Sequence, residues 1–209
     1  MRRGWGLTES RTIYFGHWQT LFIGSLAVAF GFAGVTLLNI LRNPLGFPGG
    51  VLAGAVLGFV LHETAHREAA RRQGCIAGFV LTPTGMLITL LSGVLRSIGL
   101  PFAILAPGYV AIICQAWGWG AINRRDDIIA ASGPAVNILL AIAAILATRF
   151  TTSLPLLWFL NGFASINAWL AFFNLLPLEP LDGAKIMRNN IILWIVMIIA
   201  SILLAFPPT

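Results

Sequence analysis

Two histidines and a glutamate lie within five residues of one another, in the run His62-Glu63-Thr64-Ala65-His66. On a helix, residues four positions apart project from the same face, so the imidazoles of His62 and His66 can reach one metal ion. Glu63 directly follows the first histidine, where its carboxylate can hold a metal-bound water and accept its proton. The pattern predicts a zinc site that activates water, although the same five residues also occur by chance in helices.

The apolar stretch before this motif favours the metal site over a chance match. No charged residue occurs between Val51 and Glu63, so the motif closes a hydrophobic run. An ionisable group deep in a bilayer costs roughly 2.5–3.5 kcal/mol on insertion scales, which makes it a functional candidate by default. The third histidine of the chain, His17, stands at the start of another apolar run. We expect it to be solvated rather than to bind metal.

The composition is that of a membrane protein. Of the 209 residues, 58% are hydrophobic and 10% are charged, and the mean hydropathy is +0.88, far more apolar than a soluble domain of this length. A net charge of +6 could indicate nucleic acid, but the arginines cluster at the ends of apolar runs. We therefore expect a lipid bilayer around the protein and no nucleic-acid partner. Cys75 and Cys114 give only a weak indication of a disulfide.

The fold class follows from the apolar runs, four of which are long enough to span a bilayer. The second of these carries the His-Glu motif, and a shorter fifth run lies near the C-terminus. We expect an all-α polytopic membrane protein with about five transmembrane helices, forming one domain over residues 1–209. The expected spans are Gln19–Leu41, Val51 to the arginines after His66, Ile128–Thr148, Leu154–Leu176 and Ile191–Phe206.

Residues 73–123 do not fit a simple span. Gly74–Thr82 and Tyr109–Ile113 are predicted as strands, because their residues alternate or are β-branched and proline or glycine bounds them. Arg72 and Arg124 are expected on the same side of the membrane, so this segment crosses it either twice or not at all. We favour a re-entrant, strand-containing segment between the second and third clear spans, which is tolerated where the backbone is buried in protein.

Basic residues predict the orientation, because cytoplasmic loops of membrane proteins are enriched in lysine and arginine. Two, Arg42 and Arg149, fall on one side of the expected membrane. Ten fall on the other: Arg2, Arg3, Arg11, Arg67, Arg71, Arg72, Arg124, Arg125, Lys185 and Arg188. The expected location is the cell membrane, with several spans and with the N-terminus and the metal-site end facing the cytoplasm.

Polar residues on the third and fourth spans must find partners in a membrane. We expect Asn137, Asn161 and Asn167 to form hydrogen bonds, those of Asn161 and Asn167 chiefly between helices. After the fourth span, two prolines end the helix, and Asp182-Gly183 is predicted to form a tight turn. That turn could direct the Asp182 carboxylate toward the histidines as a third zinc ligand, although Asp-Gly after proline is also an ordinary loop.

Three motifs in this order resemble the site-2 protease family of intramembrane metalloproteases. They are His62-Glu63-x-x-His66, Gly133-Pro134-x-x-Asn137 and Asn174-x-x-Pro177-x-x-x-x-Asp182-Gly183. The similarity covers a catalytic core of about residues 51–188 and is greatest to small prokaryotic and archaeal members without a PDZ domain. It implies one zinc ion per chain on His62, His66 and Asp182, with Glu63 as the general base. It also implies that Asn174 orients the substrate or polarises its carbonyl, and that Asn137 supports the core.

The expected function is hydrolysis of peptide bonds within or near transmembrane segments, by a zinc-activated water with Glu63 as general base. The expected partner is a membrane-protein substrate whose transmembrane segment unwinds at the cleaved bond. Two alternatives remain: a membrane transporter of metal ions and a protein that binds membrane segments without cutting them. Glu179 is the nearest competitor of Asp182 for the third ligand position. We prefer Asp182, because Gly183 after it lets the backbone turn sharply.

Overall fold

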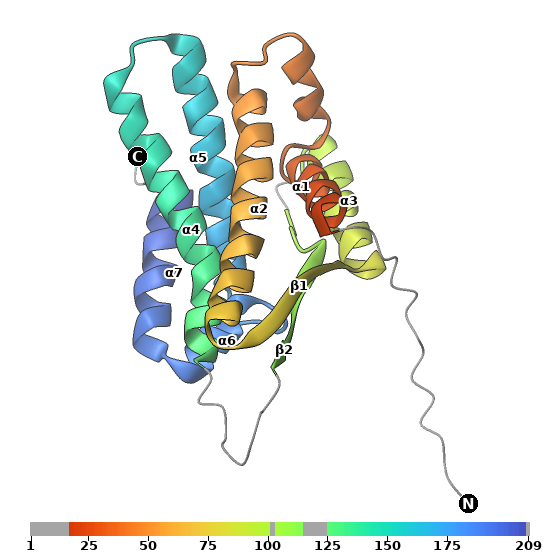
Figure 1. Cartoon of the computed structure of the whole chain (residues 1–209). Coiled ribbons are helices and arrows are strands. Elements are labelled where there is room, and N and C mark those ends of the chain that lie inside the picture. The colour runs from red at the N-terminus through yellow and green to blue at the C-terminus, as the bar shows by residue number, and fades with distance from the viewer. Residues whose placement is uncertain (1–16, 101–102, 115–124, 208–209) are drawn as a thin grey trace, which may run out of the picture.

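The computed structural model describes residues 17–100, 103–114 and 125–207, and its helices form a bundle around α2 (Phe47–Arg72). On one side of α2 lie α4 (Asp126–Ala147) and α5 (Leu154–Asn174), and on the other lies α1 (His17–Ala33) (Figure 1). Among the described residues, four helical stretches are long and apolar enough to cross a membrane: Trp18–Leu41, Phe47–Arg72, Asp126–Phe150 and Leu154–Asn174. Large apolar side chains remain exposed on the outside of the bundle, as lipid contact requires: Leu87, Leu139, Trp158 and Ile192 are examples. The prediction of a polytopic helical membrane protein is confirmed.

The first expected span consists of two pieces. α1 ends at Ala33, and a 3₁₀ helix, η1 (Gly34–Leu41), continues from it after Gly34 adopts a φ of +58°. The C-terminal end of α3 (Pro83–Ser97) forms hydrogen bonds with the backbone around Gly34. Arg96 Nε donates to the Phe32 carbonyl at 3.0 Å. The Ser97 hydroxyl oxygen accepts from the Val35 amide at 2.9 Å. These side chains satisfy backbone groups that a change of helix type leaves without partners.

The second span begins earlier than expected. The expected start was Val51, but α2 starts at Phe47, with Pro48 in its first turn. Proline fits there because the first turn of a helix has no partner for the missing N–H. The turn before this span is formed by the residues that precede Phe47, and Pro48-Gly49-Gly50 belong to the helix.

Three glycines spaced four residues apart, Gly50, Gly54 and Gly58, let α2 and α5 approach closely. A Cβ added at Gly50 would lie 1.9 Å from the Phe159 carbonyl oxygen, and one at Gly54 would lie 2.5 Å from the Ile166 side chain. Small residues at this spacing are typical of close helix contacts in membranes. The backbone carbonyls of α2 thereby come within reach of polar side chains on α5.

The segment between the second and third long helices contains both predicted strands. β1 (Cys75–Leu81) and β2 (Gly108–Cys114) pair antiparallel with α3 between them along the chain, so the segment returns to the side where it began. α3 has only 15 residues, too few to cross a bilayer without help from another element. This arrangement favours the re-entrant alternative. Cys75 and Cys114 lie opposite each other in the sheet and form a disulfide, which the sequence indicated only weakly.

The C-terminal elements close the bundle beside α4 and α5. A short 3₁₀ turn, η2 (Thr148–Phe150), leads from α4 toward α5, and α6 (Asp182–Asn189) and α7 (Ile191–Ala205) follow α5. The predicted tight turn at Asp182-Gly183 was wrong, because Asp182 is the first residue of α6. A Cβ at Gly183 would lie 2.1 Å from the Leu175 carbonyl oxygen, so the glycine is needed for close packing and not for a turn.

Candidate metal centre

The two histidines of the motif lie one turn apart on α2 and face the interior of the bundle. His62 is 4% exposed and His66 is 5% exposed. Their Nε2 atoms are 3.0 Å apart, and their ring centroids are separated by 4.6 Å. The helical spacing expected from the sequence is therefore realised with both side chains directed at one point.

Hydrogen bonds on the far side of each ring determine which nitrogen carries the proton. His66 Nδ1 lies 2.7 Å from the Ile129 carbonyl oxygen, which can only accept, so Nδ1 is the donor. His62 Nδ1 lies 2.5 Å from Asn137 Oδ1, which is likewise an acceptor. Neutral imidazoles in these tautomers have their lone pairs on Nε2. A metal-binding histidine usually has such a partner on its second nitrogen.

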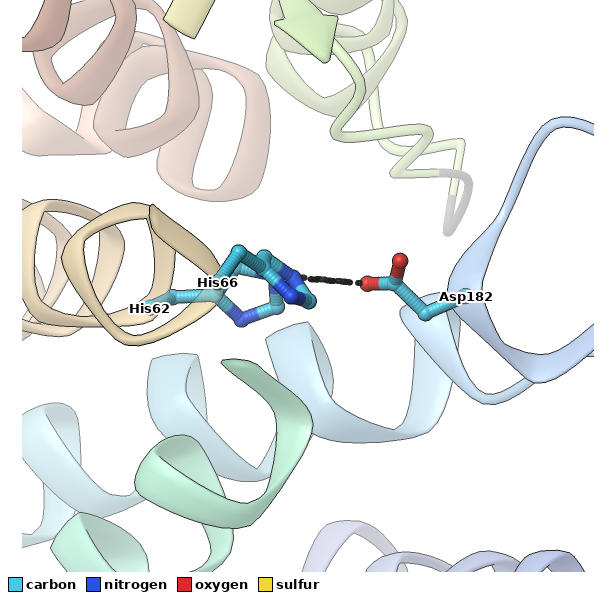
Figure 2. A group of neighbouring side chains, drawn as sticks. All are labelled: His62, His66 and Asp182. Atoms are coloured by element: carbon cyan, nitrogen blue, oxygen red, sulfur yellow. Dashed lines mark hydrogen bonds and ion pairs between the residues drawn. The ribbon is translucent and has the colours of Figure 1, made fainter. Parts of the chain in front are cut away.

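Asp182 completes a triangle with the two histidines from the start of α6. Its Oδ2 lies 3.0 Å from His66 Nε2 and 3.5 Å from His62 Nε2. Figure 2 shows the carboxylate directed at the two rings from the opposite side of the site. With lone pairs on both Nε2 atoms, neither ring donates a proton to this carboxylate, so the three donor atoms converge on the space between them.

The donor set and its spacing fit a zinc ion. Two lone-pair nitrogens and a carboxylate oxygen in mutual contact repel one another unless a cation or a proton lies between them. In a tetrahedral site with bonds of about 2.0–2.1 Å, ligand atoms stand about 3.3–3.4 Å apart. The observed separations of 3.0, 3.0 and 3.5 Å are close to that spacing. Among the described residues, this is the group of histidine, cysteine or acidic side chains placed to hold a metal ion.

Glu63 lies in the same cavity as the three candidate ligands. Its side chain is 8% exposed. The cavity has a volume of about 380 Å³ and is bounded on one side by residues of β2, including Tyr109, Val110 and Ile112. Lys185 lines it as well, and its Nζ stands 3.7 Å from Asp182 Oδ1. A carboxylate, a candidate metal position and space for a peptide thus occur together.

The structure also places the two remaining candidate site residues, Asn174 and Glu179, in different surroundings. Asn174 lines the cavity, and its Nδ2 donates to the Leu170 carbonyl at 2.9 Å. Because an amide nitrogen carries two hydrogens, this bond leaves one for another acceptor. Glu179 forms an ion pair with Arg188 at 2.7 Å, and more than half of its side chain is exposed. Of the two acidic residues, only Asp182 reaches the histidines.

Two features of the site were not recognised from the sequence. A Cβ added at Gly133 would lie 2.3 Å from His66 Nε2 and 2.6 Å from His62 Nε2, so only glycine leaves room for the two rings. Asn167 supports Asn137 from α5, with its Oδ1 2.9 Å from Asn137 Nδ2. Gly133 belongs to the Gly-Pro motif noted above, which was the available signal. A hydrogen bond of Asn167 between helices was expected, but no short-range pattern indicated Asn137 as its partner.

Comparison with known proteins found relatives that are named as putative zinc metalloproteases. The chain is 32% identical over 142 residues to a Methanocaldococcus jannaschii protein named "Putative zinc metalloprotease MJ0611", which covers 67% of this chain and 70% of the relative. It is 30% identical over 178 residues to a Mycobacterium tuberculosis protein named "Putative zinc metalloprotease Rip2", found in two strains, which covers 78% of this chain and 67% of the relative. No family model matched the chain, and no solved structure did.

These relatives share most of their length with the chain, and both are named as zinc metalloproteases. Their similarity agrees with the three motifs, with the helical membrane fold and with the buried group formed by His62, His66 and Asp182. The chain belongs to the site-2 protease family.

Proposed function

We propose that this protein is an intramembrane zinc metalloprotease, which hydrolyses peptide bonds within or near transmembrane segments of membrane-protein substrates. The observation that carries the proposal is the placement of Glu63 beside His62, His66 and Asp182 in one buried cavity at the end of a spanning helix. His62, His66 and Asp182 would hold one zinc ion per chain. This donor set, two imidazoles and a carboxylate, is that of several catalytic zinc sites.

A zinc ion at this position supplies Lewis acidity, which polarises a peptide carbonyl and makes a nearby water more acidic. Glu63 takes a proton from the attacking water on its carboxylate and later returns it to the leaving amine. The second N–H of Asn174 donates to the carbonyl oxygen as negative charge develops there. Burial of these groups strengthens each interaction, because little water competes inside the cavity.

The substrate reaches this site in an extended conformation. A helical peptide bond has its carbonyl already hydrogen-bonded and shielded by side chains, so the substrate segment must unwind. β2 pairs with β1 along one edge, and the described part of the sheet has two strands, with residues of β2 lining the cavity. The edge of β2 away from β1 offers backbone groups that an extended segment can pair with.

The site lies toward the cytoplasmic face in this proposal. The orientation rests on the excess of basic residues at the N-terminus and at the end of α2 that carries the histidines. Water would enter from that face, where Lys185 and Asn189 of α6 line the polar part of the cavity.

The test compares Glu63→Gln with the wild-type protein for cleavage of a model transmembrane substrate and for bound zinc. We expect the variant to lose cleavage and to retain roughly one zinc per chain, because Glu63 transfers protons and does not bind the metal. Glu68→Gln is the matched control: Glu68 stands on the same helix, half exposed and paired with Arg72 at 3.1 Å.

The alternatives give different results in the same experiment. A metal transporter would move zinc across vesicles and show no cleavage in either protein. A protein that only binds membrane segments would capture the substrate without producing fragments. Equal turnover by Glu63→Gln and the wild type would refute the proposed role of Glu63.

A further inference from the structure

A chain of buried amides runs from His62 into the bundle, away from the cavity. His62 Nδ1 contacts Asn137 Oδ1 at 2.5 Å, and Asn137 Nδ2 contacts Asn167 Oδ1 at 2.9 Å. Both asparagines are fully buried. The chain therefore joins a candidate zinc ligand on α2 to α4 and then to α5.

The direction of every bond in this chain is determined by backbone carbonyls. Asn167 Nδ2 lies 2.9 Å from the Phe163 carbonyl and 3.4 Å from that of Gly54, and both can only accept. The Asn167 nitrogen must face them, so its oxygen faces Asn137. Asn137 Nδ2 donates to Asn167 and also to the Gly58 carbonyl at 3.3 Å. Turning either amide over would put acceptors against acceptors, which buried groups avoid.

Helix packing makes this arrangement possible. Gly54 and Gly58 bring the carbonyls of α2 next to the asparagines, and a Cβ at Gly58 would lie 2.2 Å from Asn167 Oδ1. The same added atom would stand 3.1 Å from Asn137 Nδ2. The two glycines thus admit a polar pair where a side chain would otherwise separate the helices.

We propose that Asn167 is a positioning residue for the metal site, acting on His62 through Asn137. By holding the Asn137 oxygen toward His62, it makes Nδ1 the donor and leaves the lone pair on Nε2, where the metal binds. The inference rests on the proposed function only in that it takes the site to be a zinc site. An interhelical hydrogen bond without this role would stabilise the bundle and leave zinc affinity unchanged.

The main variant is Asn167→Leu, which has similar bulk and no polar group. The Asn137 amide then keeps only its longer bond to the Gly58 carbonyl, at 3.3 Å, and is held less firmly, so that His62 populates the other tautomer more than in the wild type. Loss of such a second partner typically lowers metal affinity by about 10–100-fold. Asn161→Leu is the matched control, because Asn161 stands on the same helix but has an exposed side chain, contrary to the contact between helices expected from the sequence.

Two measurements need no proteolysis. Zinc affinity is obtained by competition with a chromogenic chelator, using purified protein in detergent. The tautomer is read from ¹⁵N–¹H correlations of the metal-free protein labelled at histidine, which is practical because the chain has three histidines. We expect Asn167→Leu to weaken zinc binding by about 10–100-fold and to raise the Nε2–H form of His62, while Asn161→Leu matches the wild type in both.

Two results would overturn the inference. One is an Asn167→Leu protein that melts earlier but binds zinc within two-fold of the wild type, which leaves only a structural role. The other is a spectrum of the metal-free wild type in which the proton of His62 is on Nε2. This measurement does not need the variant, so it tests the inference even if Asn167→Leu fails to fold. Failure of the proposed function is distinguishable, because an absence of cleavage with the expected change in zinc affinity leaves the role of Asn167 intact.

Discussion

Gly133→Ala tests the geometry of the metal site with a single added methyl group. The new Cβ would lie 2.3 Å from His66 Nε2 and 2.6 Å from His62 Nε2. Ordinary contact begins near 3.4 Å, so the rings must retreat by about 1.1 Å and 0.8 Å, or α4 must move. Metal–ligand distances tolerate only about 0.2 Å. The displacement is several times larger, so we expect zinc affinity to fall by more than about 100-fold, beyond the usual effect of a second-sphere change.

The same variant should remain folded. Overpacking by one methyl typically costs about 1–3 kcal/mol, which a bundle of this size tolerates. Zinc content by mass spectrometry, chelator competition and cleavage of a model substrate should all show the loss, while the metal-free protein keeps its helical circular dichroism. Gly78→Ala is the control, since nothing lies within 4 Å of a Cβ built there. A Gly133→Ala protein with wild-type zinc affinity and turnover would show that the two rings do not meet a metal at this point.

Two further predictions concern residues outside α2. Asp182→Asn should lose both zinc and cleavage, because it removes the charge of the carboxylate that faces the histidines. Glu179→Gln should keep both, because Glu179 pairs with Arg188 and is not one of the three candidate ligands. The reverse pattern in a metal assay would contradict the assignment. Cys75→Ser should lower the melting temperature in detergent, since the disulfide to Cys114 closes a loop with a sequence separation of 39, and loop-closure entropy at that length is worth about 3–4 kcal/mol. A dithiol reductant should bring the wild type to the same melting temperature, and an unchanged value in both cases would argue against the bond.

The local parts of the molecule were predictable because their physics is local. The spacing of His62 and His66 on one face depends only on the helical repeat, and the long apolar helices follow from hydropathy and length. β1 and β2 were found within one or two residues for the same reason: alternation and bounding glycine or proline act over a few positions. The start of α4 was expected at Ile128 and lies at Asp126, where acidic residues suit the first turn of a helix.

Failures occurred where a distant segment changes local preference. The break at Gly34 depends on Arg96 and Ser97 of α3, which lie more than 60 residues further along the chain. Asp182 looked like part of a turn, but it begins α6, where Gly183 lies close to the end of α5. Neither contact has a signature within a short window of sequence.

The sequence by itself determined the chemical identity of the candidate ligands and the helix that carries the two histidines. Tertiary structure decided whether they meet: Asp182 reaches the histidines because α6 packs against α4, and the rings have room because Gly133 lies opposite them. The orientation of His62 depends on Asn167, 105 positions away, and on glycines that let α2 and α5 touch. A ligand's chemistry is a property of one residue, whereas its direction and its protonated nitrogen depend on contacts between helices, which exist only after the bundle has packed.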